Sequence, residues 1–159
     1  MFNGDKDSDN YETDKEAWTM IKDYIPTDKK IWSPFYCTGK MKEDFKELFN
    51  LDIIHEDKDF FSYEPDDYGY IIDNPPYSKF QEIAIRLKEL DKPFILIGFP
   101  KTFLTKKFQN LFRNNMQLII PNSRPTFTHL NNPKKGYTPP FGTWYYCYKM
   151  NLEHDLTWL

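Results

Sequence analysis

The segment YIIDNPPYSKF at residues 70–80 decides how the fold is read, because an apolar run stops there at two consecutive prolines. Proline fixes its own backbone φ, offers no N–H and biases the preceding residue towards an extended conformation. Asn-Pro-Pro is therefore a stiff, non-helical corner at the end of a strand. Such a corner holds the side chains of Asn74 and Tyr77 in definite directions.

The rest of the chain alternates amphipathic segments with short apolar runs. Helical spacing predicts helices over 15–24, 40–49, 79–90 and 105–112, and β-like runs predict strands over 30–32, 52–55, 68–72, 94–99, 117–120 and 142–150. The run FILIGF at 94–99 has the continuous apolar character of a strand covered on both faces. This order predicts an α/β fold with a mostly parallel sheet and helices on both faces. Ligands of such folds bind at the carboxyl ends of the strands, where the Asn74 corner lies.

Length and composition favour one domain. The chain has 159 residues, of which 40% are apolar, enough for one ordinary core. We expect a flexible N-terminus over residues 1–10 and a single domain over 11–159, with no separate target-recognition domain. No run approaches 18 uncharged apolar residues and the start is acidic. We therefore expect no membrane span, no signal peptide, and a cytoplasmic or nuclear-type compartment.

Charge and cysteine content constrain the partners. Residues 1–78 hold 9 basic and 19 acidic residues, whereas residues 79–159 hold 12 and 5. An acidic half suits a cationic small molecule and a basic half suits a polyanion; two solvated faces of different sign are the alternative. Cys37 and Cys147 lie far apart and match no metal-binding spacing, so we expect reduced thiols and no metal site.

A second corner lies after the first expected strand of the sheet, in Pro34-Phe35-Tyr36-Cys37-Thr38-Gly39. The two corners together resemble those of the S-adenosylmethionine (SAM)-dependent amino-methyltransferases, in particular the compact DNA adenine N6-methyltransferases of phages and large DNA viruses. That family has a Pro-Phe-x-Gly-x-Gly turn after its first strand and an (Asp/Asn)-Pro-Pro-(Tyr/Phe) corner after its fourth. The segments YETDKEAW at 11–18, IIPNSRPTF at 119–127 and FGTWYYCY at 141–148 are similar to flanking parts of the family.

The resemblance implies a class I methyltransferase fold, which is Rossmann-like and has an antiparallel last strand. Only 13 residues separate Glu56 from Tyr70, too few for the usual helix and strand between these motifs. We therefore expect the third strand to be reduced or missing.

The resemblance also implies a role for each residue of the Asn-Pro-Pro-Tyr corner. An amino nitrogen conjugated to an aromatic ring is a poor nucleophile and must be aligned with the methyl carbon and sulfur of the sulfonium. The Asn74 side-chain oxygen and the Pro75 carbonyl are the expected acceptors for that amino group, next to Pro76 in the rigid turn. Tyr77 is the expected stacking surface for a base held outside the DNA duplex.

The cofactor residues follow from the same resemblance. Glu56, with Asp57 as the other choice, is expected to accept from the ribose hydroxyls, and Asp59 and Phe60 are expected to contact the adenine. Tyr11 and Thr13 are expected to close over the methionine part. The remaining cofactor contacts are expected from the two corners, at Pro34, Phe35, Tyr36, Gly39 and Asn74.

DNA is the expected partner, with RNA as the second choice. The sequence is compatible with a homodimer or with a complex with another protein. Cations in the basic half are expected to contact phosphates without reading bases. These are Lys79, Lys101, Lys106, Lys107, Arg124, Lys134 and Lys135.

Three positions depart from the family pattern. Cys37 stands in place of a glycine, Ser33 in place of a common acidic residue and Asp14 in place of a common proline. A Cβ atom at position 37 would crowd the methionine end of SAM unless the backbone φ there is negative. The alternatives to a DNA adenine methyltransferase are a methyltransferase for RNA adenine or protein glutamine, and a non-catalytic methyltransferase-like subunit that binds nucleic acid.

Overall fold

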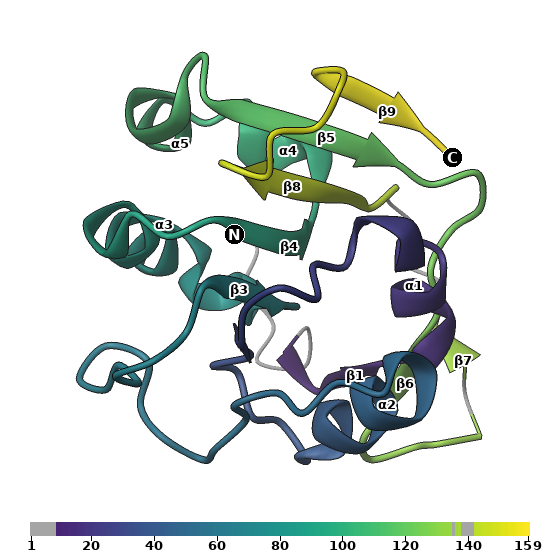
Figure 1. Ribbon diagram of the computed structural model, residues 1–159. Coiled ribbons are helices and arrows are strands. Elements are labelled where there is room, and N and C mark those ends of the chain that lie inside the picture. Colours follow the sequence, from purple (N-terminus) through teal and green to yellow (C-terminus); the bar gives the residue numbers. More distant parts are fainter. Residues whose placement is uncertain (1–8, 135, 138–141) are drawn as a thin grey trace.

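The computed structural model describes residues 9–134, 136–137 and 142–159 (Figure 1). Most of the segment expected to be flexible, residues 1–8, lies outside that range. The next two residues contact the domain. The carboxylate of Asp9 accepts hydrogen bonds from the backbone and hydroxyl of Ser78, and the carbonyl of Asn10 accepts from Leu130 N–H at 3.0 Å.

A six-stranded sheet forms the centre of the molecule and confirms the α/β class. Its spatial order is β2 (Ile31–Trp32), β3 (Tyr70–Asp73), β4 (Phe94–Gly98), β8 (Trp144–Tyr148), β5 (Met116–Ile120) and β9 (Leu156–Trp158). The strands β2, β3 and β4 are parallel, β8 is antiparallel to both of its neighbours, and β9 is parallel to β5. Since β5 and β9 run in the same direction as β2, β3 and β4, only β8 is reversed; the sheet is mixed and mostly parallel, as expected.

Helices cover both faces of this sheet. The helices α3 (Phe80–Leu90) and α5 (Lys106–Phe112) pack on one face, and α1 (Lys15–Thr19) and α2 (Lys40–Phe49) pack on the other (Figure 1). The strand β4 shows why. Phe94 and Leu96 belong to the core under α3 and α5, whereas Ile95 and Ile97 belong to the core under α1 and α2. The run FILIGF is thus buried on both faces because successive side chains of a strand alternate.

A second, three-stranded sheet was not expected from the sequence. It consists of β1 (Tyr11–Thr13), β6 (Phe127–His129) and β7 (Gly136–Tyr137), all antiparallel. Each strand has at most three residues, too few to show an alternating pattern in the sequence. The pairing joins the start of the domain to a segment more than a hundred residues later, with Thr13 opposite Phe127.

Several expected elements differ from those observed. The helix expected over 15–24 stops at Thr19 and is followed by a short 3-10 helix, η2 (Lys22–Tyr24). The strand expected over 52–55 is reduced to one bridge between Trp32 and Ile54. A 3-10 helix, η3 (Tyr77–Lys79), precedes α3, and a short helix, α4 (Pro100–Phe103), follows β4.

The resemblance led to two specific expectations about the sheet, a reduced or missing third strand and an antiparallel last strand. Residues 57–69, all of which the structure describes, form no strand, as expected. The strand β8 is antiparallel, but it is not the last one. The strand expected last, over 142–150, is β8, so its antiparallel direction is confirmed; β9 was not expected and extends the sheet at its edge in parallel to β5 (Figure 1). Within the described residues, no helix has the length and apolar character needed to cross a membrane.

Candidate functional site

The two corners of the sequence meet at one edge of the sheet. The turn at 33–39 follows β2, and the Asn-Pro-Pro-Tyr corner at 74–77 follows β3. These two strands are adjacent and parallel, with Trp32 opposite Ile71. Because parallel strands end at the same edge, the segments that leave them lie side by side.

A buried carboxylate connects these two corners. Asp73, the last residue of β3, accepts hydrogen bonds at Oδ2 from Ser33 Oγ and Phe35 N–H, both at 2.7 Å. Its Oδ1 accepts from Asn74 N–H at 2.7 Å. Burial raises the pKa of Asp73 to about 7, although the three donors act in the opposite direction. The Asp73 carboxylate thus contacts Ser33, which replaces a common acidic residue of the family that the sequence resembles.

The turn at 33–39 has two residues with left-handed backbone. Gly39 has a φ of 83°, and a Cβ atom there would lie 2.6 Å from the Tyr36 hydroxyl oxygen. Cys37 has a φ of 51°. The backbone therefore lacks the negative φ that would keep the Cys37 Cβ atom away from the place expected for the methionine part of SAM. Cys37 is exposed as a residue, and its side chain lines the cleft described below. Neighbouring atoms partly bury the sulfur, and this raises the pKa of Cys37. The other cysteine, Cys147, is buried and also unpaired.

A histidine that the sequence analysis did not identify supports this turn. His55 is buried, and its ring stacks on Tyr36 with centroids 5.0 Å apart. Its Nδ1 lies 2.8 Å from the Ser33 carbonyl oxygen, which can only accept, so Nδ1 carries the proton. Burial lowers the pKa of His55, so the ring is neutral in the folded protein.

The side chain of Asn74 is fixed by two neighbours. Its Nδ2 donates to Thr13 Oγ1 at 3.0 Å, and its Oδ1 accepts from Tyr77 Oη at 2.9 Å. Thr13 and Tyr77 together hold the amide in place, with Oδ1 on the side of Tyr77. A carboxamide oxygen has two lone pairs, so Oδ1 can accept one more hydrogen bond from a ligand.

The ring of Tyr77 already has an aromatic neighbour. Phe99 lies against it with centroids 4.1 Å apart and an interplanar angle of 32°. Burial raises the pKa of Tyr77, so its hydroxyl stays protonated and remains a donor to Asn74. One face of the ring is covered, and a ligand would stack on the other face or displace Phe99.

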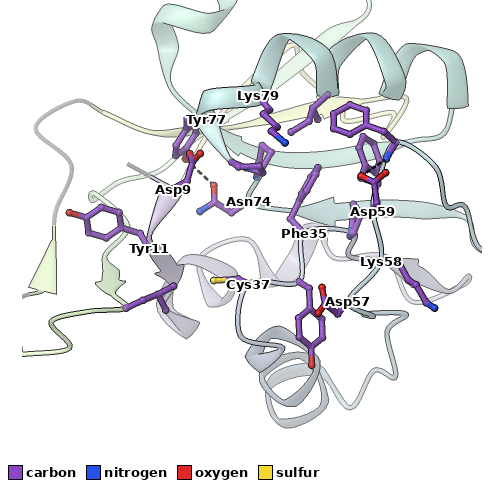
Figure 2. Close-up of a pocket in the computed structure, with 18 of the residues that line it drawn as sticks. Asp9, Tyr11, Phe35, Cys37, Asp57, Lys58, Asp59, Asn74, Tyr77 and Lys79 are labelled. Carbon is purple, nitrogen blue, oxygen red and sulfur yellow. Dashed lines mark hydrogen bonds between the residues drawn. The ribbon is translucent and has the colours of Figure 1, made fainter. Parts of the chain in front are cut away.

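Both corners line one cleft with a volume of about 410 Å³. Figure 2 shows Asn74, Tyr77, Tyr11 and Asp9 at one end and Asp57 with Lys58 at the other, with Phe35 between them. The expected site residues that line the cleft are Tyr11, Pro34, Phe35, Tyr36, Asp59, Phe60, Asn74, Pro75, Pro76, Tyr77 and Lys79. This size lies within the usual range for small-molecule sites.

Three expected cofactor residues are placed differently. Thr13 lines a smaller recess beside the cleft, together with Asp73 and Asn74. Gly39 shapes the turn without lining either cavity.

Glu56, the first choice for the ribose carboxylate, is not among the described residues that line the cleft, and its carboxylate accepts from Tyr63 Oη at 2.8 Å. Asp57, the second choice, does line the cleft and is the better candidate. Asp59 also lines it but accepts from Ser62 Oγ at 2.8 Å.

The expected phosphate contacts are mostly outside the cleft. Among the described cations, Lys79 and Lys58 line it, whereas five expected contacts do not: Lys101, Lys106, Lys107, Arg124 and Lys134. Lys135 lies outside the described residues. Lys101 lies near Phe99, with Nζ 5.8 Å from the ring centroid.

Several lining residues were not assigned from the sequence. They are Asp9, Lys58, Phe61, Ile83, Phe99, Phe127 and Leu130. Only Phe99 carried a signal, because it directly follows an apolar strand at the edge where ligands bind. The others reach the cleft through contacts between distant segments.

The described residues contain no group of three or more His, Cys, Asp or Glu side chains that could hold a metal ion. No protein-family model matches this chain, and a search of curated proteins returns no match.

The strained backbone at Cys37 leads to a stability prediction. A non-glycine residue in the left-handed region costs about 1 kcal/mol or more, and glycine avoids that cost. We expect Cys37→Gly to raise the free energy of unfolding by up to about 1 kcal/mol in urea titrations. Asn50→Gly, at a φ of 54° and away from the cleft, is the control and should give a smaller gain because asparagine tolerates this region. A destabilised Cys37→Gly protein would contradict the strain.

The buried carboxylate leads to a pH prediction. Because the pKa of Asp73 is raised from 3.8 to about 7, its contribution to stability is fully present below pH 4 and lost as the pH rises through 7. His55 acts in the opposite direction, since its pKa is lowered and its contribution is lost on acidification. The difference between wild type and Asp73→Asn therefore isolates Asp73.

We expect the wild-type free energy of unfolding, relative to Asp73→Asn, to fall by on the order of a few kcal/mol between pH 5 and pH 8. Urea titrations of both proteins across this range measure it. A pH-independent difference would show that Asp73 has an ordinary pKa.

Proposed function

We propose that this protein is a SAM-dependent methyltransferase that transfers a methyl group to the exocyclic amino group of adenine in DNA. The observation that carries the proposal is the position of Asn74. Its amide oxygen lies at one end of a cleft whose wall is the 34–37 turn and whose other end holds Asp57. A nucleophile held at Asn74 and a cofactor held along the turn would meet in one cavity.

The arrangement of the sheet supports the class I methyltransferase fold. The two motif-bearing corners follow adjacent parallel strands, the segment between Glu56 and Tyr70 is short and strandless, and β8 runs antiparallel between β4 and β5. These are the features that the resemblance implies. The extra parallel strand β9 is an addition at the sheet edge.

The cleft has the chemistry that a bound SAM molecule requires. Asp57 offers a carboxylate for hydroxyl groups, and Phe35 and Phe60, with centroids 5.1 Å apart, offer apolar faces. The backbone near Cys37 and the recess beside Thr13 border the place expected for the methionine part. SAM supplies a methyl group on a positively charged sulfonium.

The protein's own residues would orient the amino nitrogen and stabilise its developing charge. With SAM bound, the nitrogen lone pair would form the new bond to the methyl carbon as the carbon–sulfur bond breaks, and the electrons of that bond would stay on sulfur. Asn74 Oδ1 and the Pro75 carbonyl accept from the amino N–H groups, which favours the charge that forms on nitrogen. The proton then leaves to solvent, so no strong base is needed in the transfer step.

One observation favours a non-catalytic role as the second candidate. Cys37 keeps a left-handed backbone and points a thiol into the cleft where the family has glycine. Titration calorimetry with SAM separates the two functions. Absence of binding at about 1 mM SAM would reject the enzyme in favour of a methyltransferase-like subunit that binds nucleic acid. A transfer assay with tritiated SAM against duplex DNA, single-stranded DNA, RNA and protein tests the substrate class.

Replacement of the acceptor should abolish transfer while leaving cofactor affinity largely intact. Asn74→Ala removes the oxygen that matters most in the transition state, so we expect turnover to fall about 100-fold or more, with a small change in the SAM dissociation constant. Thr13→Val, which removes only the hydroxyl that accepts from Asn74 Nδ2, should cost less. Near wild-type turnover for Asn74→Ala would remove Asn74 from the mechanism.

The aromatic ring at position 77 should matter more than its hydroxyl. Tyr77→Ala loses stacking worth about 1–3 kcal/mol and should raise the KM for the nucleic acid accordingly. Tyr77→Phe keeps the ring and loses only the hydrogen bond to Asn74, so we expect a mild effect. Steady-state kinetics of both variants measure the difference. If phenylalanine is as damaging as alanine, the hydroxyl and not the stacking is the important feature.

A further inference from the structure

Asp73 is in an unusual position for a buried charged residue. The residue is 3% exposed and lies between the two corners. Its Oδ2 faces the turn at 33–39, and its Oδ1 faces the Asn74 corner. Two of its three donors are backbone N–H groups, those of Phe35 and Asn74. Backbone donors fix the chain itself, whereas a bond between two side chains would leave the chain free to shift.

The pairing of β2 with β3 ends before it reaches the 33–37 turn and the Asn74 corner. The β2–β3 ladder consists of two pairs, and its last pair is Trp32 with Ile71. The turn is tied to the following segment by Ser33 N–H, which donates to the Ile54 carbonyl at 2.9 Å, and by His55. Across the ladder's open end, between the 33–37 turn and residues 73–74, the hydrogen bonds of Asp73 continue the connection.

We propose that Asp73 is a positioning residue that sets the spacing between the 33–37 turn and the Asn74 corner. One carboxylate group replaces the next rungs of the ladder at the point where both strands turn away from each other. Its effect on methyl transfer rests on the proposed function. The clamp itself is a property of the free protein and can be tested without SAM or a substrate.

An asparagine at this position shows why a carboxylate is needed. The carboxamide has one acceptor oxygen and one donor NH₂ group. If its oxygen faces Asn74 N–H, the NH₂ group faces Phe35 N–H, and if it is flipped, the NH₂ group faces Asn74 N–H. Ser33 can reverse its role and accept, but a backbone N–H cannot. In either orientation one backbone donor is left without an acceptor, and the clamp opens on one side.

Cys37 provides a readout of the clamp that does not depend on activity. It is the exposed thiol at the end of the clamped turn, whereas Cys147 is buried and serves as the internal reference for global unfolding. The limiting rate of Cys37 alkylation at high pH reports on the mobility of the turn. A full pH–rate profile is needed because burial and the charges of Glu12 and Asp73 raise the pKa of Cys37, so that loss of the Asp73 charge alters it, and His55 borders the same recess.

We expect Asp73→Asn to raise the limiting alkylation rate of Cys37 by about fivefold or more, with Cys147 still protected. The matched control is Asp44→Asn, which removes a second buried carboxylate; Asp44 lies on α2, does not line the cleft, and pairs with Lys40 of α2 and Lys15 of α1. This control should lower the Tm without changing the limiting rate. Equal rates in the two variants would overturn the proposal, because loss of any buried carboxylate would then suffice.

Ser33→Ala is the milder variant to be used if Asp73→Asn does not fold. It removes the side-chain donor and leaves both backbone bonds of Asp73 in place, so we expect an alkylation rate close to that of wild type. A rate as high as that expected for Asp73→Asn would show that the hydroxyl, and not the carboxylate, holds the turn, which would also overturn the proposal.

Transfer kinetics then separate this proposal from the proposed function. A 1 Å change in spacing between nucleophile and methyl donor is expected to lower turnover by about 10- to 100-fold. Asp73→Asn should show that loss in kcat with a smaller change in the KM for SAM, and Asp44→Asn should not. If wild type transfers no methyl group to any substrate, the proposed function fails while the alkylation result still decides the clamp. If Asp73→Asn opens the turn but keeps full turnover, the positioning role in transfer is rejected.

Discussion

The parallel pairing of β2 with β3 is the constraint on which the site depends. The pairing places Ile31 opposite Tyr70 and Trp32 opposite Ile71, so both chains leave the sheet at the same edge and level. Trp32 and Ile71 are fully buried, which keeps this short ladder in register because a slip would take the Trp32 ring away from Phe60 and Tyr68, against which it packs. Residues 33–37 and 73–77 therefore start side by side, and the hydrogen bonds of Asp73 continue the connection beyond the last strand pair.

Local patterns predicted the elements that build this frame. The helix expected over 40–49 is observed over the same residues as α2, and the FILIGF strand is buried on both faces. The Asn-Pro-Pro corner ends β3 where the prolines required it. Each of these features depends on residues close together in the sequence, where periodicity and proline stereochemistry act directly.

The parts of the site that the sequence did not predict depend on contacts between distant segments. Thr13 reaches the Asn74 amide only because β1 pairs with β6, and three-residue strands carry no readable pattern. Asp73 had no signal as a bridging residue, since Ser33 is forty residues away. The sequence also provided no basis for a choice between Glu56 and Asp57 as the residue that faces the cleft. They are neighbours, and the backbone after a single β-bridge, not a strand period, decides which carboxylate faces the cleft.

The distribution of charge around the cleft gives the opposite signs of the two halves of the chain a physical meaning under the proposed function. Three carboxylates line the cleft, those of Asp9, Asp57 and Asp59, all from the acidic half, against two cations, Lys58 and Lys79; this small excess of negative charge favours a cationic ligand such as a sulfonium. Most of the expected cations of the basic half lie outside the cleft. A nucleic acid would therefore keep its backbone outside and insert only an uncharged base, since its phosphates would be repelled at the cleft wall. Under the proposed function, extrusion of the base from the duplex brings its amino group within reach of Asn74 while the phosphates stay outside the cleft.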